Sequence, residues 1–169
     1  MAKIVETERL VIREITVEDA GFICELLNTP SFIKYIGDRG VRTVADAARF
    51  INDRYRQSYR EHGYGLYVVE LKSDDIAIGI CGFVRRDTLP GPDLGFAFLP
   101  EHRRKGFGYE SAAAMMKYGR EVLGFDKVFA ITSLDNEISG KLLAKLGFDF
   151  ERLIEMPAGE QLKLFHCKT

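Results

Sequence analysis

The stretch RRKGFG at residues 103–108 constrains the fold of this chain more than any other part of the sequence. It follows an apolar run at 94–99 and precedes a run at 109–123 whose apolar residues recur at helical spacing, which predicts a strand that enters a helix through a tight turn. The first turn of a helix has backbone N–H groups without internal partners, and the helix dipole adds partial positive charge there. Gly106 and Gly108 have no Cβ, so an anion can approach that backbone closely. The stretch therefore predicts a binding site for phosphate groups.

Length and composition are those of an ordinary globular domain. The chain has 169 residues, of which 46% are hydrophobic and 29% charged, and we expect a single domain that spans residues 1–169. Its 24 basic and 25 acidic residues give a formal net charge of −1. Broad electrostatic binding to nucleic acid is therefore disfavoured, although a local basic patch is compatible with this balance.

The cysteines and histidines are too scattered along the chain to predict a disulfide framework or a metal site. No pair among them has the spacing of metal ligands. They are Cys24, Cys81, Cys167, His62, His102 and His166. No apolar run approaches the roughly 20 residues that a membrane-spanning helix needs. Glu6 and Glu8 interrupt the N-terminal segment, which argues against a signal peptide. We expect a cytoplasmic protein that uses no metal and binds neither nucleic acid nor membrane.

The periodicity of the chain predicts an α+β fold with a mixed sheet of about seven strands. The turns between the runs at 65–71, 76–84 and 94–99 predict an antiparallel meander, and the crossover helix after 94–99 predicts that the strand at 127–133 is parallel to it. The predicted strands cover residues 8–15, 65–71, 76–84, 94–99, 127–133, 148–155 and 161–167, and the predicted helices follow Thr16, Thr43, Gly108 and Asn136.

Two pairs of residues have the spacing of a helix-capping box, in which two side chains satisfy each other's backbone N–H groups. They are Thr16 with Asp19 and Thr43 with Asp46. Between the two helices that they begin, residues 31–42 are predicted to be irregular. This segment either forms one wall of a binding cleft or packs its apolar side chains under a loop.

Three separate stretches together resemble the GNAT superfamily of acyl-CoA-dependent N-acetyltransferases. Arg103, Gly106 and Gly108 match its Arg/Gln-x-x-Gly-x-Gly/Ala signature, and ETERLVIREITVEDA (6–20) and DNEISGKLLAKLGFDFE (135–151) are similar to other parts of the family. Within it, the chain most resembles the RimJ/RimL-like ribosomal-protein N-terminal acetyltransferases, with spermidine N-acetyltransferases as close relatives. The resemblance implies a three-layer fold, with helices on both faces of a twisted sheet and a splayed pair of parallel central strands.

The resemblance also implies a cosubstrate, acetyl-CoA, and residues that bind it. The pyrophosphate would lie on the backbone N–H groups from residue 104 to residue 109, and the pantetheine arm would run beside the strand that precedes the motif. The alternative for Arg104 and Lys105 is a solvated basic corner. The implied cofactor-binding residues are Phe96, Ala97, Phe98, Arg103, Arg104, Lys105, Gly106, Phe107, Gly108, Tyr109 and Asn136.

The implied reaction is direct attack of a primary amine on the acetyl carbonyl, through a tetrahedral intermediate. Leu143 stands where many relatives carry a tyrosine proton donor, so Ser139 is the best donor candidate, with the alternative that Asn136 and Ser139 only cap a helix. Asp93 is the best candidate for a catalytic base. Its alternative is a turn aspartate that follows Pro92.

Two further positions bear on the site. Relatives commonly carry a glutamate where this chain has Ala112, while Glu110 lies two residues earlier, so any role of that glutamate is in doubt here. His102 adjoins the motif, and we expect it to be exposed.

The acceptor is the least constrained part of this interpretation. The resemblance implies a peptide N-terminus or a small amine, and a homodimer is compatible with it. The alternatives are a non-catalytic domain that binds or senses acyl-CoA, and a nucleotide-binding protein. The motif lacks the Gly-Lys-Ser/Thr ending of nucleotide loops, which argues against the latter.

Overall fold

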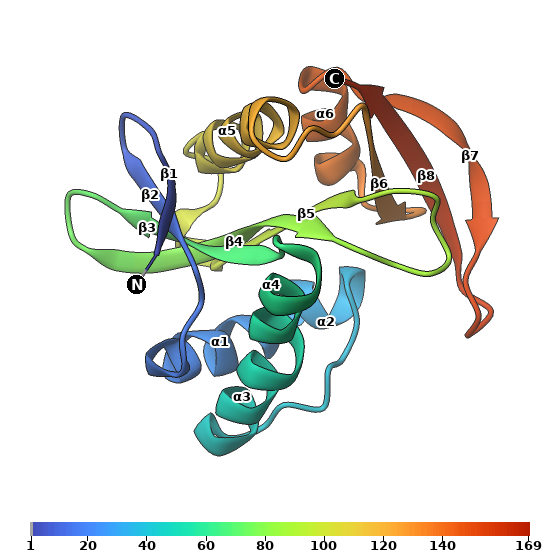
Figure 1. Cartoon of the computed structure of the whole chain (residues 1–169). Coiled ribbons are helices and arrows are strands. Elements are labelled where there is room, and N and C mark those ends of the chain that lie inside the picture. Colours follow the sequence, from blue (N-terminus) through green and yellow to red (C-terminus); the bar gives the residue numbers. More distant parts are fainter. Residues whose placement is uncertain (1) are drawn as a thin grey trace.

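A computed structural model describes residues 2–169 and shows one eight-stranded mixed sheet. The strands lie side by side in the order β1-β2-β3-β4-β5-β6-β8-β7 (Figure 1). Their bounds are β1 Lys3–Glu6, β2 Leu10–Arg13, β3 Leu66–Leu71, β4 Ile76–Val84, β5 Asp93–Phe98, β6 Lys127–Ser133, β7 Asp149–Glu155 and β8 Gln161–Lys168. The predicted α+β class and the predicted meander of β3, β4 and β5 are confirmed.

Helices cover both faces of the sheet, as predicted. The four helices α1 to α4 lie on one face, and α5 and α6 lie on the other (Figure 1). The helical segments are η1 Val17–Asp19, α1 Ala20–Leu27, α2 Pro30–Tyr35, α3 Val44–Phe50, η2 Ile51–Arg56, α4 Gln57–His62, η3 Pro100–His102, α5 Phe107–Glu121 and α6 Glu137–Lys145. Within residues 2–169, no helix is both long enough and apolar enough to cross a membrane.

The N-terminal strand differs from its prediction, because two short strands replace the single one expected at 8–15. Thr7 and Leu10 close a tight turn: the Thr7 N–H donates to the Leu10 carbonyl at 2.9 Å, and the Thr7 hydroxyl accepts from the Leu10 N–H at 3.1 Å. This turn folds β1 back onto β2 as an antiparallel pair. The sheet therefore has eight strands instead of about seven.

The segment after α1 is also more regular than predicted. Pro30 is the first residue of α2, where its missing N–H costs nothing. The Thr29 side chain caps this helix by accepting a hydrogen bond from the Phe32 N–H. Phe32 is buried, while Tyr35 and Ile36 are more accessible. The predicted irregular segment therefore begins with a short helix.

The helix that begins at Thr43 contains an unusual turn. Its predicted capping box is confirmed, since Thr43 and Asp46 exchange backbone-to-side-chain hydrogen bonds of 3.0 and 3.2 Å. Between α3 and α4, η2 is a π-helix, a wide turn that is frequent at functional sites. Gly63, with a φ of 79°, ends α4.

A buried ion pair fixes the start of the first helical segment. Arg13 donates two hydrogen bonds of 2.9 Å to the Asp19 carboxylate and one of 3.1 Å to Glu70 on β3. The same carboxylate accepts from the Thr16 N–H at 2.9 Å. Breaking such a buried pair typically costs about 3–5 kcal/mol of stability, because one charge is left without a partner. The ion pair therefore fixes the start of the helical layer, which consists of α1 to α4, to the sheet.

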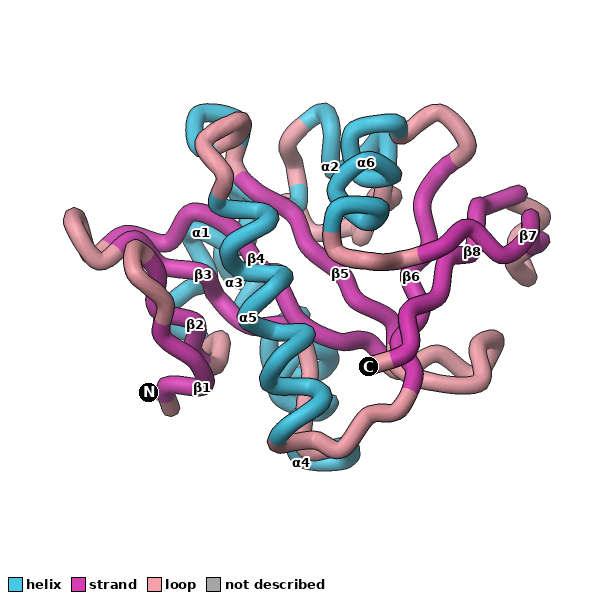
Figure 2. Tube along the Cα trace, turned by 90° about the horizontal axis from the view of Figure 1, so that it is seen from above, coloured by secondary structure: helices cyan, strands magenta, loops and turns pink. Residues whose placement is uncertain are grey.

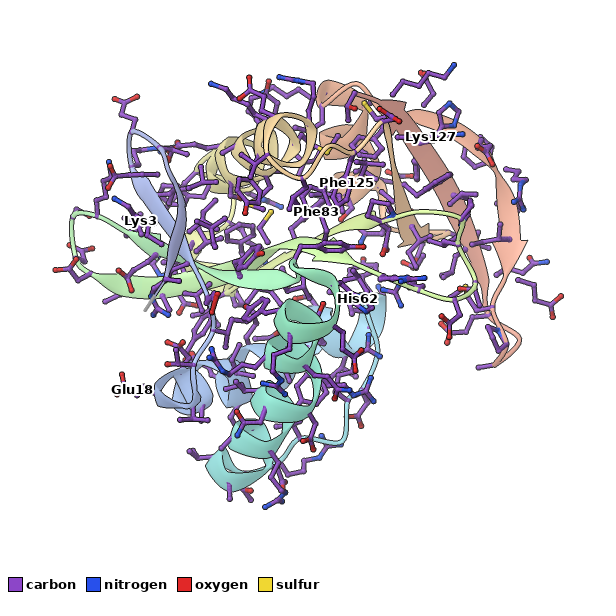
Figure 3. The ribbon with its side chains drawn as sticks, viewed as in Figure 1. Lys3, Glu18, His62, Phe83, Phe125 and Lys127 are labelled. Atoms are coloured by element: carbon purple, nitrogen blue, oxygen red, sulfur yellow. The ribbon has the colours of Figure 1, made fainter. Side chains whose placement is uncertain are left out.

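Aromatic packing sets the distance between α5 and the sheet. Phe83 on β4 and Phe125 after α5 meet edge to face, with 5.1 Å between ring centroids (Figure 3). Gly119 of α5 lies directly above this pair, and a Cβ there would come within 2.9 Å of the Phe83 ring. The close approach explains a glycine in the interior of a helix, where it is otherwise unfavourable.

The two central parallel strands, β5 and β6, pair at only one position. Their single paired position joins Asp93 to Phe129, and the Phe129 N–H donates to the Pro92 carbonyl at 2.9 Å. Figure 2 shows the two strands diverging from there, with α2 and α6 near the wide end. The predicted splay is therefore confirmed, and it opens a gap in the middle of the sheet.

Candidate active site

The turn formed by residues 103–108, called the motif turn below, has the backbone geometry of an anion-binding site. Arg104 and Gly106 both adopt left-handed conformations, with φ of 62° and 84°, and the second of them precedes the first residue of α5. Within residues 2–169, none of the backbone N–H groups from Arg104 to Tyr109 donates a hydrogen bond to the protein. Left-handed geometry is costly for a non-glycine residue such as Arg104. The turn therefore presents consecutive free donors, as the sequence predicted.

Glu110 holds this turn in place. Its carboxylate accepts hydrogen bonds from the Thr7 hydroxyl at 2.6 Å and from the Arg9 side chain at 2.7 Å, and Arg9 also donates to the Lys105 carbonyl at 3.0 Å. Burial acts to raise the pKa of Glu110, but the hydrogen bonds from Thr7 and Arg9 outweigh it and lower that pKa. Ala112, where relatives carry a glutamate, is fully buried in the core. Glu110 thus connects the turn to the β1–β2 hairpin.

Arg103 does not point its charge at the turn. Its guanidinium donates two hydrogen bonds to the Phe98 carbonyl, at 2.9 and 3.2 Å, and a further one to the Ser31 hydroxyl on α2. The side chain therefore ties the end of β5 to the helical layer. Its role toward a cofactor stays a prediction.

The free edge of β5 faces the gap in the sheet. The Leu99 N–H donates to the Ile78 carbonyl at 2.9 Å, and a Cβ on Gly79 would lie 2.5 Å from the Ala97 carbonyl, so Ala97 and Leu99 turn their backbone groups toward β4. The backbone N–H and C=O groups of successive residues in a strand point to opposite sides, so those of Phe96 and Phe98 point toward the gap. Of the three predicted residues on this edge, these two offer backbone groups that an extended ligand could pair with: both groups of Phe96, and the N–H of Phe98, whose carbonyl is occupied by Arg103.

One cleft of about 1440 Å³ follows this gap. Arg104 and Tyr109 line it at the motif end, and Arg39 and Arg54 line it at the opposite end. Every predicted site residue borders it except two, Lys105 and Phe107. The splay therefore brings the predicted donor site and the predicted catalytic residues into one continuous space.

Asp93 is buried at the point where β5 and β6 meet. Its side chain is only 2% exposed, and one carboxylate oxygen, Oδ2, accepts a hydrogen bond of 3.2 Å from Arg86. Within residues 2–169 the other oxygen, Oδ1, has no hydrogen-bond partner. Burial raises the pKa of Asp93, against the opposing charge and hydrogen bond of Arg86. A buried carboxylate with a free oxygen on a cleft wall can accept a proton.

Asn136 and Ser139 meet at the start of α6. The Asn136 side chain accepts a hydrogen bond of 3.2 Å from the Ser139 backbone N–H, so Asn136 does cap this helix. The Ser139 hydroxyl is not used in the cap, and Ser139 borders the cleft. Leu143, one turn further on, is 1% exposed and brings no proton donor.

His102 differs from its prediction, because it is half-buried instead of exposed. It ends η3, and within residues 2–169 its buried Nδ1 has no partner. The short 3-10 turn after β5 folds the side chain onto the cleft wall. Its sequence position beside the basic motif gave no sign of this.

Arg86 is a site residue that the sequence did not single out. It pairs with Asp93 across the turn that joins β4 to β5, at a separation of seven residues. Such a spacing has no local signature, and only the antiparallel pairing of Val84 with Asp93 brings the two side chains together. Within residues 2–169, no group of three or more His, Cys, Asp or Glu side chains is arranged to hold a metal ion.

Comparisons with known proteins agree with this geometry. The family model described as an acetyltransferase (GNAT) domain matches residues 9–149. The uncharacterized N-acetyltransferase YoaA of Bacillus subtilis is 30% identical over 155 residues, which are 91% of this chain and 87% of that protein.

Two solved structures share the fold at low sequence identity. RimL, a ribosomal L7/L12 alpha-N-protein acetyltransferase in complex with coenzyme A, superposes with a TM-score of 0.81 at 11% identity, over 98% of this chain and 97% of that one. Spermidine N-acetyltransferase from Vibrio cholerae, in complex with coenzyme A and spermine, superposes with a TM-score of 0.78 at 18% identity, over 96% of each chain.

The free N–H groups of the motif turn, the open edge of β5 and the family match lead to one conclusion. This chain belongs to the GNAT family and is an N-acetyltransferase whose acetyl donor is acetyl-CoA.

Proposed function

We propose that this enzyme transfers the acetyl group directly to a primary amine, with Asp93 as the catalytic base. The observation that carries the proposal is the free Oδ1 of a buried Asp93, on the same cleft as the motif turn. The amine nitrogen forms a bond to the acetyl carbon, a tetrahedral intermediate collapses, and the carbon–sulfur bond breaks. Starting from the protonated amine, the products are an N-acetylated amine, free coenzyme A thiol and one proton.

The proposed role of Asp93 is to remove a proton from the attacking amine. A free aliphatic amine is largely protonated near pH 7, and only its neutral form attacks. Asp93 accepts the proton on Oδ1, either from the amine or through one water, while Arg86 holds Oδ2. A raised pKa makes the carboxylate a stronger base than an exposed aspartate.

Backbone N–H groups are proposed to stabilise the negative charge that develops during the reaction. Negative charge develops on the thioester oxygen as the amine attacks, and a fixed N–H group stabilises it without reorganisation. The N–H groups of Phe96 and Phe98 face the gap where the thioester would lie. We assign this role to one of them.

Ser139 is the proposed donor of a proton to the departing thiolate. We expect Ser139→Ala to lower kcat by about 10²-fold, the low end for a general acid. Acetyl-CoA affinity should change little, since the Asn136 cap uses the backbone N–H of residue 139 and survives the substitution. Steady-state kinetics and isothermal titration measure the two quantities. Ser73→Ala, in an exposed turn, is the matched control, and a normal kcat in the first variant would remove Ser139 from the mechanism.

The proposal as a whole is tested by incubating the protein with acetyl-CoA and a panel of primary amines while free thiol is measured. We expect thiol release that depends on the amine and one acetyl group on the product by mass spectrometry. Tight binding of acetyl-CoA with no amine-dependent release would instead support a binding or sensing domain.

A further inference from the structure

The end of the cleft that lies opposite the motif turn is lined by several arginines and is called the arginine end below. Arg39 follows α2, Arg54 lies on the π-helical segment η2, and Arg85 and Arg86 follow β4. His62, labelled in Figure 3 at the end of α4, lines the same end. This arginine end is opposite the motif turn, so it belongs to the acceptor and not to the phosphates of acetyl-CoA.

Most guanidinium groups at the arginine end form no ion pair within residues 2–169, although carboxylates lie around them. Carboxylates also border this end, from Asp53, Glu61, Asp93 and Glu160. Only Asp93 pairs with an arginine of the cluster, and within residues 2–169 no carboxylate oxygen comes within 4.0 Å of the Arg39 or Arg54 guanidinium.

Three other arginines of the same helical layer are paired: Arg42 contacts Asp38, Arg49 contacts Asp46 and Arg56 contacts Glu14. Arg60 on α4 has no carboxylate partner within residues 2–169, but it donates to the Asn52 carbonyl and does not line the cleft. At the arginine end itself, Arg39, Arg54 and Arg85 have no carboxylate partner within residues 2–169.

The charges at this end lie close enough to act on one another. Desolvation lowers the pKa of Arg39, and the charges of Arg86 and Arg54 lower it further, while Tyr55 and Glu160 act in the opposite direction. Like charges held together in this way cost free energy, and that cost is relieved when an anion binds between them.

The π-helical turn gives the cluster a defined shape. Phe50 and Tyr55 pack edge to face with 5.3 Å between ring centroids, and the Arg54 guanidinium lies 5.6 Å from the centre of the Phe50 ring. A smaller hollow of about 240 Å³ next to the cleft shares Arg39, Phe50 and Arg54 with it. A guanidinium stacked on an aromatic ring is pre-oriented, so less side-chain entropy is lost when it binds a carboxylate.

We propose that the acceptor of this enzyme is an amine that carries a carboxylate a few bonds from its nitrogen, bound by Arg39 and Arg54 with the amine at Asp93. The planar guanidinium matches a carboxylate in a two-point hydrogen bond, which fixes the orientation of the acceptor. The inference rests on the proposed function, because it places the reacting amine at Asp93. Two sources supply this chemistry: a free amino acid, and a peptide with an acidic residue next to its N-terminus.

The test compares matched acceptors in the thiol-release assay. The first pair is free alanine with alaninamide, and the second is the amidated peptide Ser-Asp-Ala with its Ser-Asn-Ala counterpart, with spermidine as a cationic reference. We expect kcat/KM to be higher for the carboxylate member of one pair by at least about tenfold, a modest share of what a charge-assisted bidentate contact provides. The pair that shows the preference identifies the source, and spermidine should be the poorest acceptor.

Substitution separates recognition from chemistry. The double variant Arg39→Gln and Arg54→Gln should reduce the carboxylate preference to within about twofold, because the remaining amide groups provide only neutral hydrogen bonds. It should lower kcat/KM for the carboxamide member far less than for the carboxylate member, and it should leave the KM for acetyl-CoA unchanged. Arg42→Gln, whose side chain pairs with Asp38 and lines neither the cleft nor the smaller hollow, is the control and should keep the preference.

The outcomes that contradict the inference are distinct from failure of the proposed function. Equal use of carboxylate and carboxamide acceptors, or a preference that survives in the double variant, overturns the inference alone. Absence of thiol release with every amine overturns the proposed function, and the inference falls with it.

Discussion

Replacing Asp93 with asparagine is expected to lower kcat/KM by about 10²–10⁴-fold, the usual contribution of a positioned general base. Asparagine has nearly the same shape as aspartate, but its side chain cannot take up a proton at this position. Within residues 2–169, Oδ1 is the oxygen of this carboxylate that has no hydrogen-bond partner, since Oδ2 is held by Arg86. Asp87→Asn, an exposed carboxamide substitution in the same turn, is the control and should keep full activity.

The pH profile distinguishes a base from a purely structural aspartate. Only the ionised carboxylate accepts a proton, so kcat/KM of the native enzyme rises with pH through the pKa of Asp93, which burial places above its ordinary value. In the asparagine variant this part of the profile should disappear, and the remaining rise should follow ionisation of the amine alone. An unchanged profile in the variant would falsify the assignment of Asp93 as the base.

Stability supplies an independent readout for the same variant. Because the pKa of Asp93 is higher in the folded protein than in the unfolded chain, its contribution to stability is fully present below the unfolded pKa and is lost as pH rises through the folded pKa. Asparagine resembles the neutral carboxylic acid at every pH. We therefore expect the variant to be at least as stable as the native protein near pH 7 by thermal melting. Arg86 is 31% exposed and keeps contact with water when its partner is neutral.

Replacing Gly108 with glutamate is expected to raise the Kd for acetyl-CoA by on the order of 10²-fold or more. Two like charges about 4 Å apart repel by about 4 kcal/mol at an effective dielectric constant of 20, and the new carboxylate lies where the phosphates would bind. The fold should accept the side chain, because a Cβ at this position meets Leu142 at 3.4 Å and Phe98 at 3.8 Å, which is ordinary contact. A carboxylate in the first turn of a helix also favours the helix dipole.

Three measurements make this result specific. Isothermal titration gives the affinity, thermal melting without ligand confirms the fold, and melting with acetyl-CoA should show a smaller ligand-dependent shift in the glutamate variant. Gly108→Ala separates bulk from charge and should weaken binding much less. Gly21→Ala, in open space on α1 and away from the cleft, is the remote control. Native affinity in a folded Gly108→Glu variant would show that the phosphates bind elsewhere.

The parts of this molecule that the sequence predicts are those encoded by neighbouring residues. The motif turn depends on two glycines and a helix start within six residues, and the Thr43–Asp46 capping box depends on a spacing of three. Hydrophobic periodicity likewise predicted the meander, and the crossover rule predicted that β5 and β6 are parallel. These features follow from local physics and chain connectivity.

The parts that escaped prediction depend on contacts between distant segments. Pro30 is compatible with either the end or the first turn of a helix, and the Thr29 cap decides between them. Arg103 belongs to the motif, but its charge is taken up by the Phe98 carbonyl and by Ser31, 72 positions away in the chain. The wide turn at η2, the pairing of Arg86 with Asp93 and the burial of His102 similarly have no local signature.

Because β5 and β6 pair at a single position, the gap between them affects how donor and acceptor reach the site. A gap that crosses a sheet has two mouths, and here exposed residues line both of them, Arg104 and Tyr109 at one and Arg54 and Arg85 at the other. In the proposed mechanism, donor and acceptor enter through these two mouths and occupy the enzyme together, so that no acyl group is stored on the protein between two half-reactions. The two mouths are also built from different segments of the chain, so substitutions around η2 can alter the choice of acceptor while the residues that receive the donor stay as they are.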